Sequence, residues 1–400
     1  MFTLIKNEMV KILRRKKTLV ITIGFIALVA LICFSSYKES ENMKRWSSPE
    51  ASIRQLQAQI AEVKKQQNDD STSKELKIQN ELNLKAWEVQ LKSEQDKLSP
   101  NWDWRASLES SIATSKNNLA SMKENKEVQQ ESLDSLKNEM DISQYRLDHN
   151  IKPTEAYDLN AFKNFDTMIM YLGSIFLIIG ILAFSSDMVS GEYTPPTMKL
   201  LLTQPVSRAK VLLSKYIASL LSALFLIIII EGIAFIIMGL IFGFGNALEP
   251  IMVGHRYKFI AAKAGAPQNT LALISGTAHI VPVWKYALMC LGLEALYITA
   301  AISFSFLVST IFMSSMISMV SGILFSIVIF VLQGFSFVKN IAPYIFIYHG
   351  NASSLLKGEM ARQLNTPNIT ISNSILVMII WIIVCYVISH LVFTKKDILI

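Results

Sequence analysis

The stretch SGEYTPPTMKLLLTQPVSR, residues 190–208, is a polar segment that lies between two strongly apolar runs. Its two consecutive prolines, Pro195 and Pro196, end any helix that arrives from upstream and favour the first turn of a new one. Residues 197–202 can then form a short amphipathic helix, which ends at Gln204 because a residue before proline is pushed out of the helical region. A helix this short is marginal alone and needs a surface to pack against. The residues alone leave two interpretations open: a docking segment, or an ordinary loop between membrane spans.

The composition is that of a membrane protein. The chain has 400 residues, of which 52% are hydrophobic, and its mean hydropathy is +0.38. The apolar residues are gathered in runs near the ~20 residues that cross a bilayer. The net charge of +7 comes from Lys and Arg that lie beside these runs, which is typical of membrane orientation and not of a nucleic-acid-binding surface. We therefore expect no nucleic-acid partner.

The apolar runs predict an all-α integral membrane protein with six transmembrane helices. The predicted spans cover residues 18–35, 167–184, 216–244, 283–312, 317–337 and 375–393. Basic residues at positions 6–17 place the N-terminus in the cytoplasm, and an even number of spans returns the C-terminus to the same side. The protein is accordingly expected to be a multi-pass protein of the cytoplasmic membrane with both termini inside.

Residues 1–17 have the pattern of an amphipathic helix that lies in the membrane interface. Phe2, Ile5, Met9 and Ile12 recur at helical spacing, and lysine and arginine occupy the other face and the end. Such a helix binds anionic membrane lipid through its basic face.

A polar insert, residues 36–166, separates the first two spans and is extracytoplasmic on this topology. Apolar residues recur at heptad-like spacing, as at Ile53, Leu56, Ile60 and Val63, which favours long, coiled-coil-like helices packed along a narrow seam. Pro100 lies almost at its middle, so the simplest architecture is one antiparallel helical hairpin with its tip near Pro100. A break at residues 68–71 leaves a shorter, folded-back bundle equally open, and a partly disordered polar insert is a third interpretation. The domains predicted are thus residues 1–17, 18–35, 36–166 and 167–400.

No catalytic or metal-binding pattern is found in the sequence. The five histidines are scattered without ligand spacing, and the three cysteines lie in separate apolar runs. A glycine-rich phosphate loop of the ATPase type is missing, so we expect no ATP-binding site or other cofactor in this chain.

Three polar residues are predicted to lie at membrane depth: Glu231, Glu294 and Gln333. Carboxylates in a bilayer are costly and usually face a protein interior or a wet path. Counting residues places all three in the outer half of the membrane, where they could share one pocket. They either line a substrate path or dimer seam, or are hydrogen-bonded within the bundle for structural reasons.

The stretch at 190–208 resembles the first cytoplasmic loop of type-2 ATP-binding-cassette exporter permeases. The matching positions are Gly191-Glu192-Tyr193, Lys199-Leu200-Leu201-Leu202-Thr203 and Pro205-Val206-Ser207-Arg208. The family usually has a glycine-threonine pair where this chain has Pro195-Pro196-Thr197, so the local geometry of the turn departs from the family pattern. The resemblance implies that residues 187–210 form a coupling loop, in which Glu192, Tyr193, Thr197, Lys199, Leu200 and Arg208 engage an ATPase subunit.

The same resemblance implies the function and the partners. ATP and magnesium would be bound by a separate ATPase subunit, and a second permease subunit, identical or different, would complete a membrane pair in a bacterial host. ATP hydrolysis would drive export of a lipid, peptide, drug or ion. An alternative is a mechanotransmitting or sensory protein whose outer insert is moved without solute transport. A third is an ion-coupled carrier that uses Glu231 and Glu294, although the internal repeat expected of such carriers is not visible.

Overall fold

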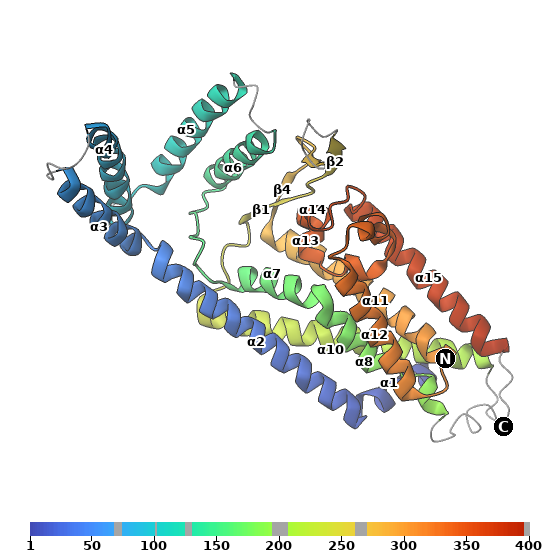
Figure 1. The fold of residues 1–400 in the computed structure, drawn as a ribbon. Helices are drawn as coiled ribbons and strands as arrows, with labels where there is room; N and C mark the ends of the chain where they lie inside the picture. Colours follow the sequence, from blue (N-terminus) through green and yellow to red (C-terminus); the bar gives the residue numbers. More distant parts are fainter. Residues whose placement is uncertain (68–73, 101, 125–129, 194–206, 261–269, 396–400) are drawn as a thin grey trace.

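The computed structural model describes residues 1–67, 74–100, 102–124, 130–193, 207–260 and 270–395 (Figure 1). Within these ranges, six helical segments are long and apolar enough to cross a membrane, which confirms the predicted number. They are α2 (Lys16–Ser47), α7 with α8 (Ala161–Tyr171 and Leu177–Ser185), α10 (Arg208–Phe242), α11 (Val283–Ile311), α12 (Ser315–Leu332) and α15 (Ile371–Lys395). Successive spans run in opposite directions, so the N-terminus and the last turn of α15 lie at the same end of the bundle.

A short helix, α1 (Phe2–Leu13), precedes the first span and lies across the end of the bundle. Arg15 is extended (φ −69°, ψ 135°), which separates α1 from α2. Ile12 is buried and Phe2 is 81% exposed, and α1 packs mainly against α10. The helix predicted over residues 1–17 is therefore confirmed from Phe2 to Leu13, and its contact with lipid stays a prediction.

The insert between the first two spans forms two helical hairpins. In the first, α3 (Pro49–Gln67) packs against α4 (Lys74–Lys97); in the second, α5 (Trp104–Glu124) packs against α6 (Gln130–Asp148). The prediction of one long hairpin with its tip near Pro100 is wrong, and the folded-back alternative describes the chain. Helices α3 and α4 lie on either side of the break predicted near residue 68 and pack against each other, and Leu56 and Ile60 of α3 are buried.

The loops between α10 and α11 contain two small β-ribbons, so the prediction of an all-α protein is wrong there. Strand β1 (Pro250–Val253) pairs antiparallel with β4 (His279–Pro282), and β2 (Tyr257–Ile260) pairs antiparallel with β3 (Thr270–Leu273). The ribbons begin shortly after Gly243 (φ +85°), where α10 ends. Helix α6 packs against β1 and β3, and Arg146 pairs with Glu249 at 2.5 Å. The second hairpin is thereby attached to the membrane bundle.

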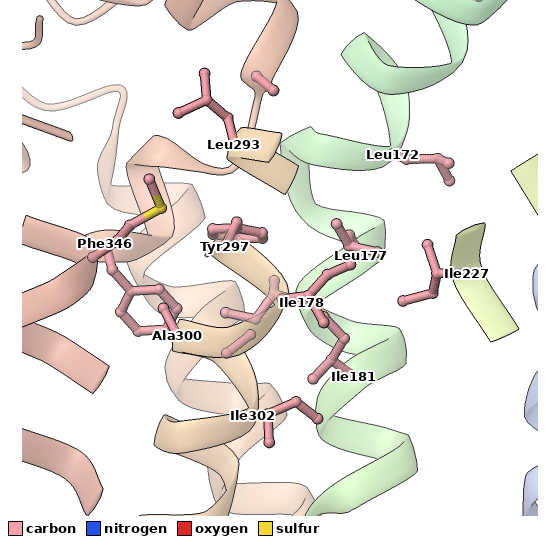
Figure 2. Packing of buried hydrophobic residues seen from close by; sticks show 14 of the residues in the cluster. Leu172, Leu177, Ile178, Ile181, Ile227, Leu293, Tyr297, Ala300, Ile302 and Phe346 are labelled. Atoms are coloured by element: carbon pink, nitrogen blue, oxygen red, sulfur yellow. The ribbon is translucent and has the colours of Figure 1, made fainter. Parts of the chain in front are cut away.

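Helix α11 lies at the centre of the bundle, where more than half of its apolar stretch is buried. It packs against α8, α10, α12 and α15. Figure 2 shows Ile178 and Ile181 of α8 facing Tyr297 and Ile302 of α11. Ala300 and Ala301 are fully buried, and such small residues let neighbouring backbones approach closely in a membrane. A tight turn joins α11 to α12, because α11 ends at Ile311 and α12 starts at Ser315.

The second span contains a π-helical turn at its middle, η1 (Leu172–Phe176). Gly173 lies so close to the backbone of Gly350 and Asn351 that an added Cβ would overlap them. Asn351 donates from Nδ2 to the carbonyl of Met170 at 3.0 Å, so a side chain inserts where the helical ladder is interrupted. This contact gives the π-turn a local cause.

Short helices connect α12 to α15 and cover the end of the bundle opposite α1. These are η3 (Ser336–Asn340), η4 (Ala342–Tyr344), η5 (Phe346–His349), α13 (Ala352–Lys357) and α14 (Glu359–Gln363). His349 is 1% exposed, and its Nδ1 lies 2.8 Å from the Ser374 hydroxyl. Burial lowers the pKa of His349 to about 4, so its imidazole is neutral at physiological pH.

Candidate functional site

The predicted coupling loop is flanked by a short turn and by the start of α10. The turn is η2 (Ser190–Glu192), and α10 begins at Arg208. Three of the predicted coupling residues, Thr197, Lys199 and Leu200, lie outside the described residues. Glu192, Tyr193 and Arg208 are described, and they stand at the two sides of the loop.

Glu192 is the centre of a buried ionic cluster and is only 3% exposed. Its Oε1 is 2.7 Å from Nζ of Lys215 and 2.6 Å from Nζ of Lys11. Lys215 also pairs with Glu8 at 3.0 Å. We call these four residues, Glu8, Lys11, Glu192 and Lys215, the ionic junction. Two cations meet two carboxylates, so the charges balance and each buried group has a partner of opposite sign.

The ionic junction joins three elements that are distant in sequence. Glu8 and Lys11 lie on α1, Glu192 ends η2, and Lys215 lies two turns into α10. The lysine is fully buried beside apolar residues of α10, where an unpaired ammonium group would be very costly. The pairing therefore fixes both sides of the loop to each other and to α1.

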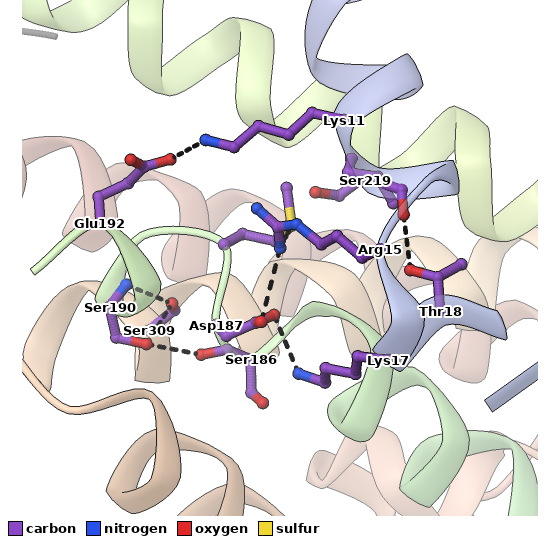
Figure 3. Close-up of polar contacts among 12 residues, drawn as sticks. Lys11, Arg15, Lys17, Thr18, Ser186, Asp187, Ser190, Glu192, Ser219 and Ser309 are labelled. Atoms are coloured by element: carbon purple, nitrogen blue, oxygen red, sulfur yellow. Dashed lines mark hydrogen bonds and ion pairs between the residues drawn. The ribbon is translucent and has the colours of Figure 1, made fainter. Parts of the chain in front are cut away.

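A second ionic contact holds the end of α8 against the turn between α1 and α2 (Figure 3). Asp187 lies 3.0 Å from Nζ of Lys17 and 3.5 Å from a guanidinium nitrogen of Arg15. Arg15 also approaches the Met188 sulfur at 3.7 Å. These groups are partly exposed, so the contact contributes less than a buried pair does.

Serine side chains of α11 and α12 hold the chain that leads into the loop. The Ser309 hydroxyl accepts hydrogen bonds from the backbone N–H groups of Val189 and Ser190, each at 3.0 Å. Ser318 donates to the carbonyl of Ser186 at 2.6 Å. Backbone groups that leave the end of α8 are thus satisfied by neighbouring helices and not by water. Figure 3 shows Ser309 beside Ser190.

Tyr193 and Arg208 stand at the two sides of the loop, and the charge of Arg208 acts on the Tyr193 hydroxyl. Tyr193 is half-buried, and this burial raises the pKa of its hydroxyl, whereas the positive charge of Arg208 acts in the opposite direction. Arg208 is the first residue of α10 and is half-buried. The predicted coupling residues that are described therefore lie near one another.

Several residues of this site were not predicted from the sequence. The sequence does not single out Lys215, Glu8, Asp187 or Ser309. Two signals were available: a lysine flanked by apolar residues at the start of a predicted span, and an acidic residue within a basic amphipathic helix. Both signals indicate a paired charge, because a lone charge at such a position is costly.

Of the three predicted intramembrane residues, Glu231 and Glu294 lie on neighbouring helices, whereas Gln333 lies elsewhere. Glu231 of α10 and Glu294 of α11 are buried, at 1% and 3% exposure, and the charge of Glu294 acts on Glu231. Gln333 caps the C-terminus of α12 and is exposed. It lines a separate cavity of about 120 Å³ with Ser174 and Tyr348, and neither glutamate contributes to that cavity.

A further polar cluster lies at the opposite end of the bundle from the ionic junction. Asp166 of α7 accepts hydrogen bonds from Tyr286 at 2.5 Å and from Ser353 at 2.7 Å, and pairs with Lys357 at 2.6 Å. This cluster joins α7, α11 and α13. An adjoining cavity of about 350 Å³ is lined by Asp166, Glu249 and other residues of the ribbon region.

The arrangement is that of a multi-pass membrane protein in which both sides of one loop are joined to several spans. No group of three or more His, Cys, Asp or Glu side chains within the described ranges could hold a metal ion. The ionic junction connects the two sides of the loop to α1 and α10, and the serine contacts connect the chain before the loop to α11 and α12.

Comparison with known proteins identifies the family. Residues 2–398 match the family described as ABC-2 family transporter protein, and the chain belongs to this family, as the loop resemblance predicted. The chain is also 26% identical over 271 residues to the uncharacterized protein YhcI of Bacillus subtilis (strain 168), a match that covers 66% of this chain and 77% of YhcI. The protein is thus a multi-pass membrane component of a transport system.

Proposed function

We propose that this chain is the permease subunit of an exporter that is driven by a separate ATPase. The ATPase would dock on residues 187–210, and the closing of its nucleotide-binding halves would push on this loop. The push would change the packing of the spans and open a path for substrate between two permease chains, identical or different. The ATPase, and not this chain, would hold ATP and magnesium.

The ionic junction is the observation that supports this proposal best. Glu192 and Lys215 lie on either side of the loop and are joined at 2.7 Å within the protein. Lys11 joins the same carboxylate to α1. A force applied to the loop would therefore reach α10 through the buried pair of Glu192 with Lys215, and α1 through the half-exposed Lys11.

Charge supports a cytoplasmic location for this end of the bundle. Further exposed basic residues lie on the same elements as the ionic junction or next to them, namely Lys6, Arg14, Lys16 and Lys210. Lysine and arginine near the ends of spans are retained on the cytoplasmic side. With this orientation, the two hairpins of the insert and the β-ribbons lie outside the cell.

Co-purification from the native host tests the proposed docking. The full-length chain is solubilised in mild detergent beside a Lys199→Ala/Arg208→Ala variant, and the recovered proteins are identified by mass spectrometry. These residues were chosen because Glu192 is buried in the ionic junction, so its removal would also damage the fold. We expect an ATP-binding-cassette ATPase with the unaltered chain and a large loss of it with the variant.

A matched control separates loss of docking from loss of fold. Lys64→Ala/Arg105→Ala removes the same two charges from the insert, far along the chain from the loop, and we expect it to keep the ATPase. Equal recovery from both double variants, or no ATPase from the unaltered chain, would contradict the proposal.

A further inference from the structure

Two glutamates from neighbouring spans meet inside the membrane bundle. Glu231 lies on α10 and Glu294 on α11, and these helices pack against each other. The side chains are 1% and 3% exposed. Both helices are among those long and apolar enough to cross a membrane, so neither carboxyl group reaches bulk water.

Glu231 has no hydrogen-bond donor within the described part of the chain. Both of its side-chain oxygens are fully buried, and neither receives a hydrogen bond from a described residue. The carboxyl group of Glu294, on the helix that packs against α10, acts electrostatically on that of Glu231. Two deprotonated carboxylates are both acceptors, however, so they cannot form a hydrogen bond with each other unless one of them holds a proton.

The charged surroundings of the pair do not offer a counter-ion. Within the described ranges, no lysine, arginine or histidine acts on either carboxyl group. Lys357 acts electrostatically on Cys290, which lies one turn before Glu294 on α11, but not on either glutamate. Lys357 is engaged by Asp166 at 2.6 Å, so this cation is already compensated.

From this geometry we propose that Glu231 and Glu294 form a proton-binding site within the membrane, in which Glu231 holds the proton and donates it to Glu294. A shared proton removes one of two like charges and turns a repulsive contact into a short, charge-assisted hydrogen bond. Glu231 is assigned as the donor because both of its oxygens lack any other partner, so its ionised form would have no compensation.

Infrared spectroscopy of the full-length chain in lipid vesicles at neutral pH tests this site. A protonated carboxyl group gives a carbonyl band that is separate from carboxylate bands and shifts in D₂O. We expect such a band in the unaltered protein, and its loss in Glu231→Gln, equal to one carboxyl group per chain. The amide of glutamine is isosteric and can donate to Glu294 in place of the lost hydroxyl.

Two matched variants fix the assignment. In Glu294→Gln the amide oxygen still accepts from Glu231, so we expect the band to remain at a shifted frequency; its disappearance would overturn the assignment of the donor. This variant also carries the test if Glu231→Gln does not fold. Glu249→Gln, which alters a glutamate paired with Arg146, should leave the band unchanged.

Small cations provide the competing explanation and are tested in the same samples. The spectra are recorded in sodium or potassium chloride and again with a bulky organic cation that cannot enter the bundle. A band that is present in all salts supports the proton. A band that appears only after sodium and potassium are withdrawn would overturn the proposal and assign the pair to a monovalent cation. This test does not depend on an ATPase partner, so it can fail or succeed separately from the proposed function.

Discussion

Replacing Lys215 by methionine tests whether the ionic junction stabilises the membrane bundle. The substitution keeps the length of the side chain but removes the cation that lies 2.7 Å from Glu192 and 3.0 Å from Glu8. Loss of one partner of a buried ion pair costs about 3–5 kcal/mol, because the remaining charge is left uncompensated. Lys11 still faces Glu192, so we expect a loss at the lower end, about 3 kcal/mol in the free energy of unfolding.

The measurement is denaturant-induced unfolding of the purified chain in detergent, followed by tryptophan fluorescence. Lys64→Met is the matched control, because Lys64 pairs with Glu88 at 2.9 Å but both side chains are more than half exposed. An exposed pair contributes about 0–1 kcal/mol, so the control should unfold nearly as the unaltered protein does. Equal effects of Lys215→Met and Lys64→Met would refute the reasoning.

A combined variant separates charge from packing at the same position. When Glu8→Gln and Glu192→Gln are added to Lys215→Met, the only charge left in the ionic junction is that of Lys11, which is half-exposed. Replacing a whole buried ionic cluster by neutral groups is often neutral for stability. We therefore expect the triple variant to recover most of the stability lost by Lys215→Met. No recovery would mean that the lysine acts through packing.

Three further predictions concern the opposite half of the bundle. Burial lowers the pKa of His349 from 6.5 to about 4; because the unfolded chain then binds the extra proton, stability should fall as the pH drops from about 6.5 to about 4, by about 3 kcal/mol in total. His349→Gln should abolish this dependence in unfolding measured at several pH values, and an unchanged dependence would contradict the assignment. Gly173→Ala places a Cβ against the backbone of Gly350, so we expect a loss of about 1–3 kcal/mol, whereas Gly180→Ala, which meets open space, should be nearly neutral in the same assay. Asp166→Asn removes the ion pair with Lys357 but keeps an acceptor for Tyr286, so its thermal unfolding temperature should fall less than that of Asp166→Ala; equal falls would show that the hydrogen bond from Tyr286 contributes nothing.

The membrane spans could be predicted from the sequence because each is encoded by its own residues. An apolar run of sufficient length has few alternatives to crossing a bilayer, and the turn near Met313 follows from two runs that almost touch. The β-ribbons could not be predicted in the same way. Their strands are four residues each, too short for a recognisable alternation, and they depend on packing against α6.

The candidate site was only partly predictable because its contacts join distant parts of the chain. The loop was recognised from the motif that begins at Gly191, but nothing local indicates that Glu192 turns inward to Lys215. The pairing of Lys215 with Glu8 spans 207 positions, and it exists only because α1 folds back onto α10. The sequence singles out Glu231 and Glu294, which come together because their two spans pack against each other. It could not show that Gln333 lies apart from this pair.

The long helix α2 connects the ionic contacts at one end of the bundle to the first hairpin of the insert. The helix continues without interruption from Lys16 to Ser47, which is about 48 Å at 1.5 Å per residue. Its base is held through Arg15 and Lys17 by Asp187, and its far end leads directly into the first hairpin. A tilt of about 10° at the base would move the far end by about 8 Å over this length. A small rotation of α2 at the ionic contacts would thus displace the first hairpin by a much larger distance. The packing at the centre of the bundle would not need to change.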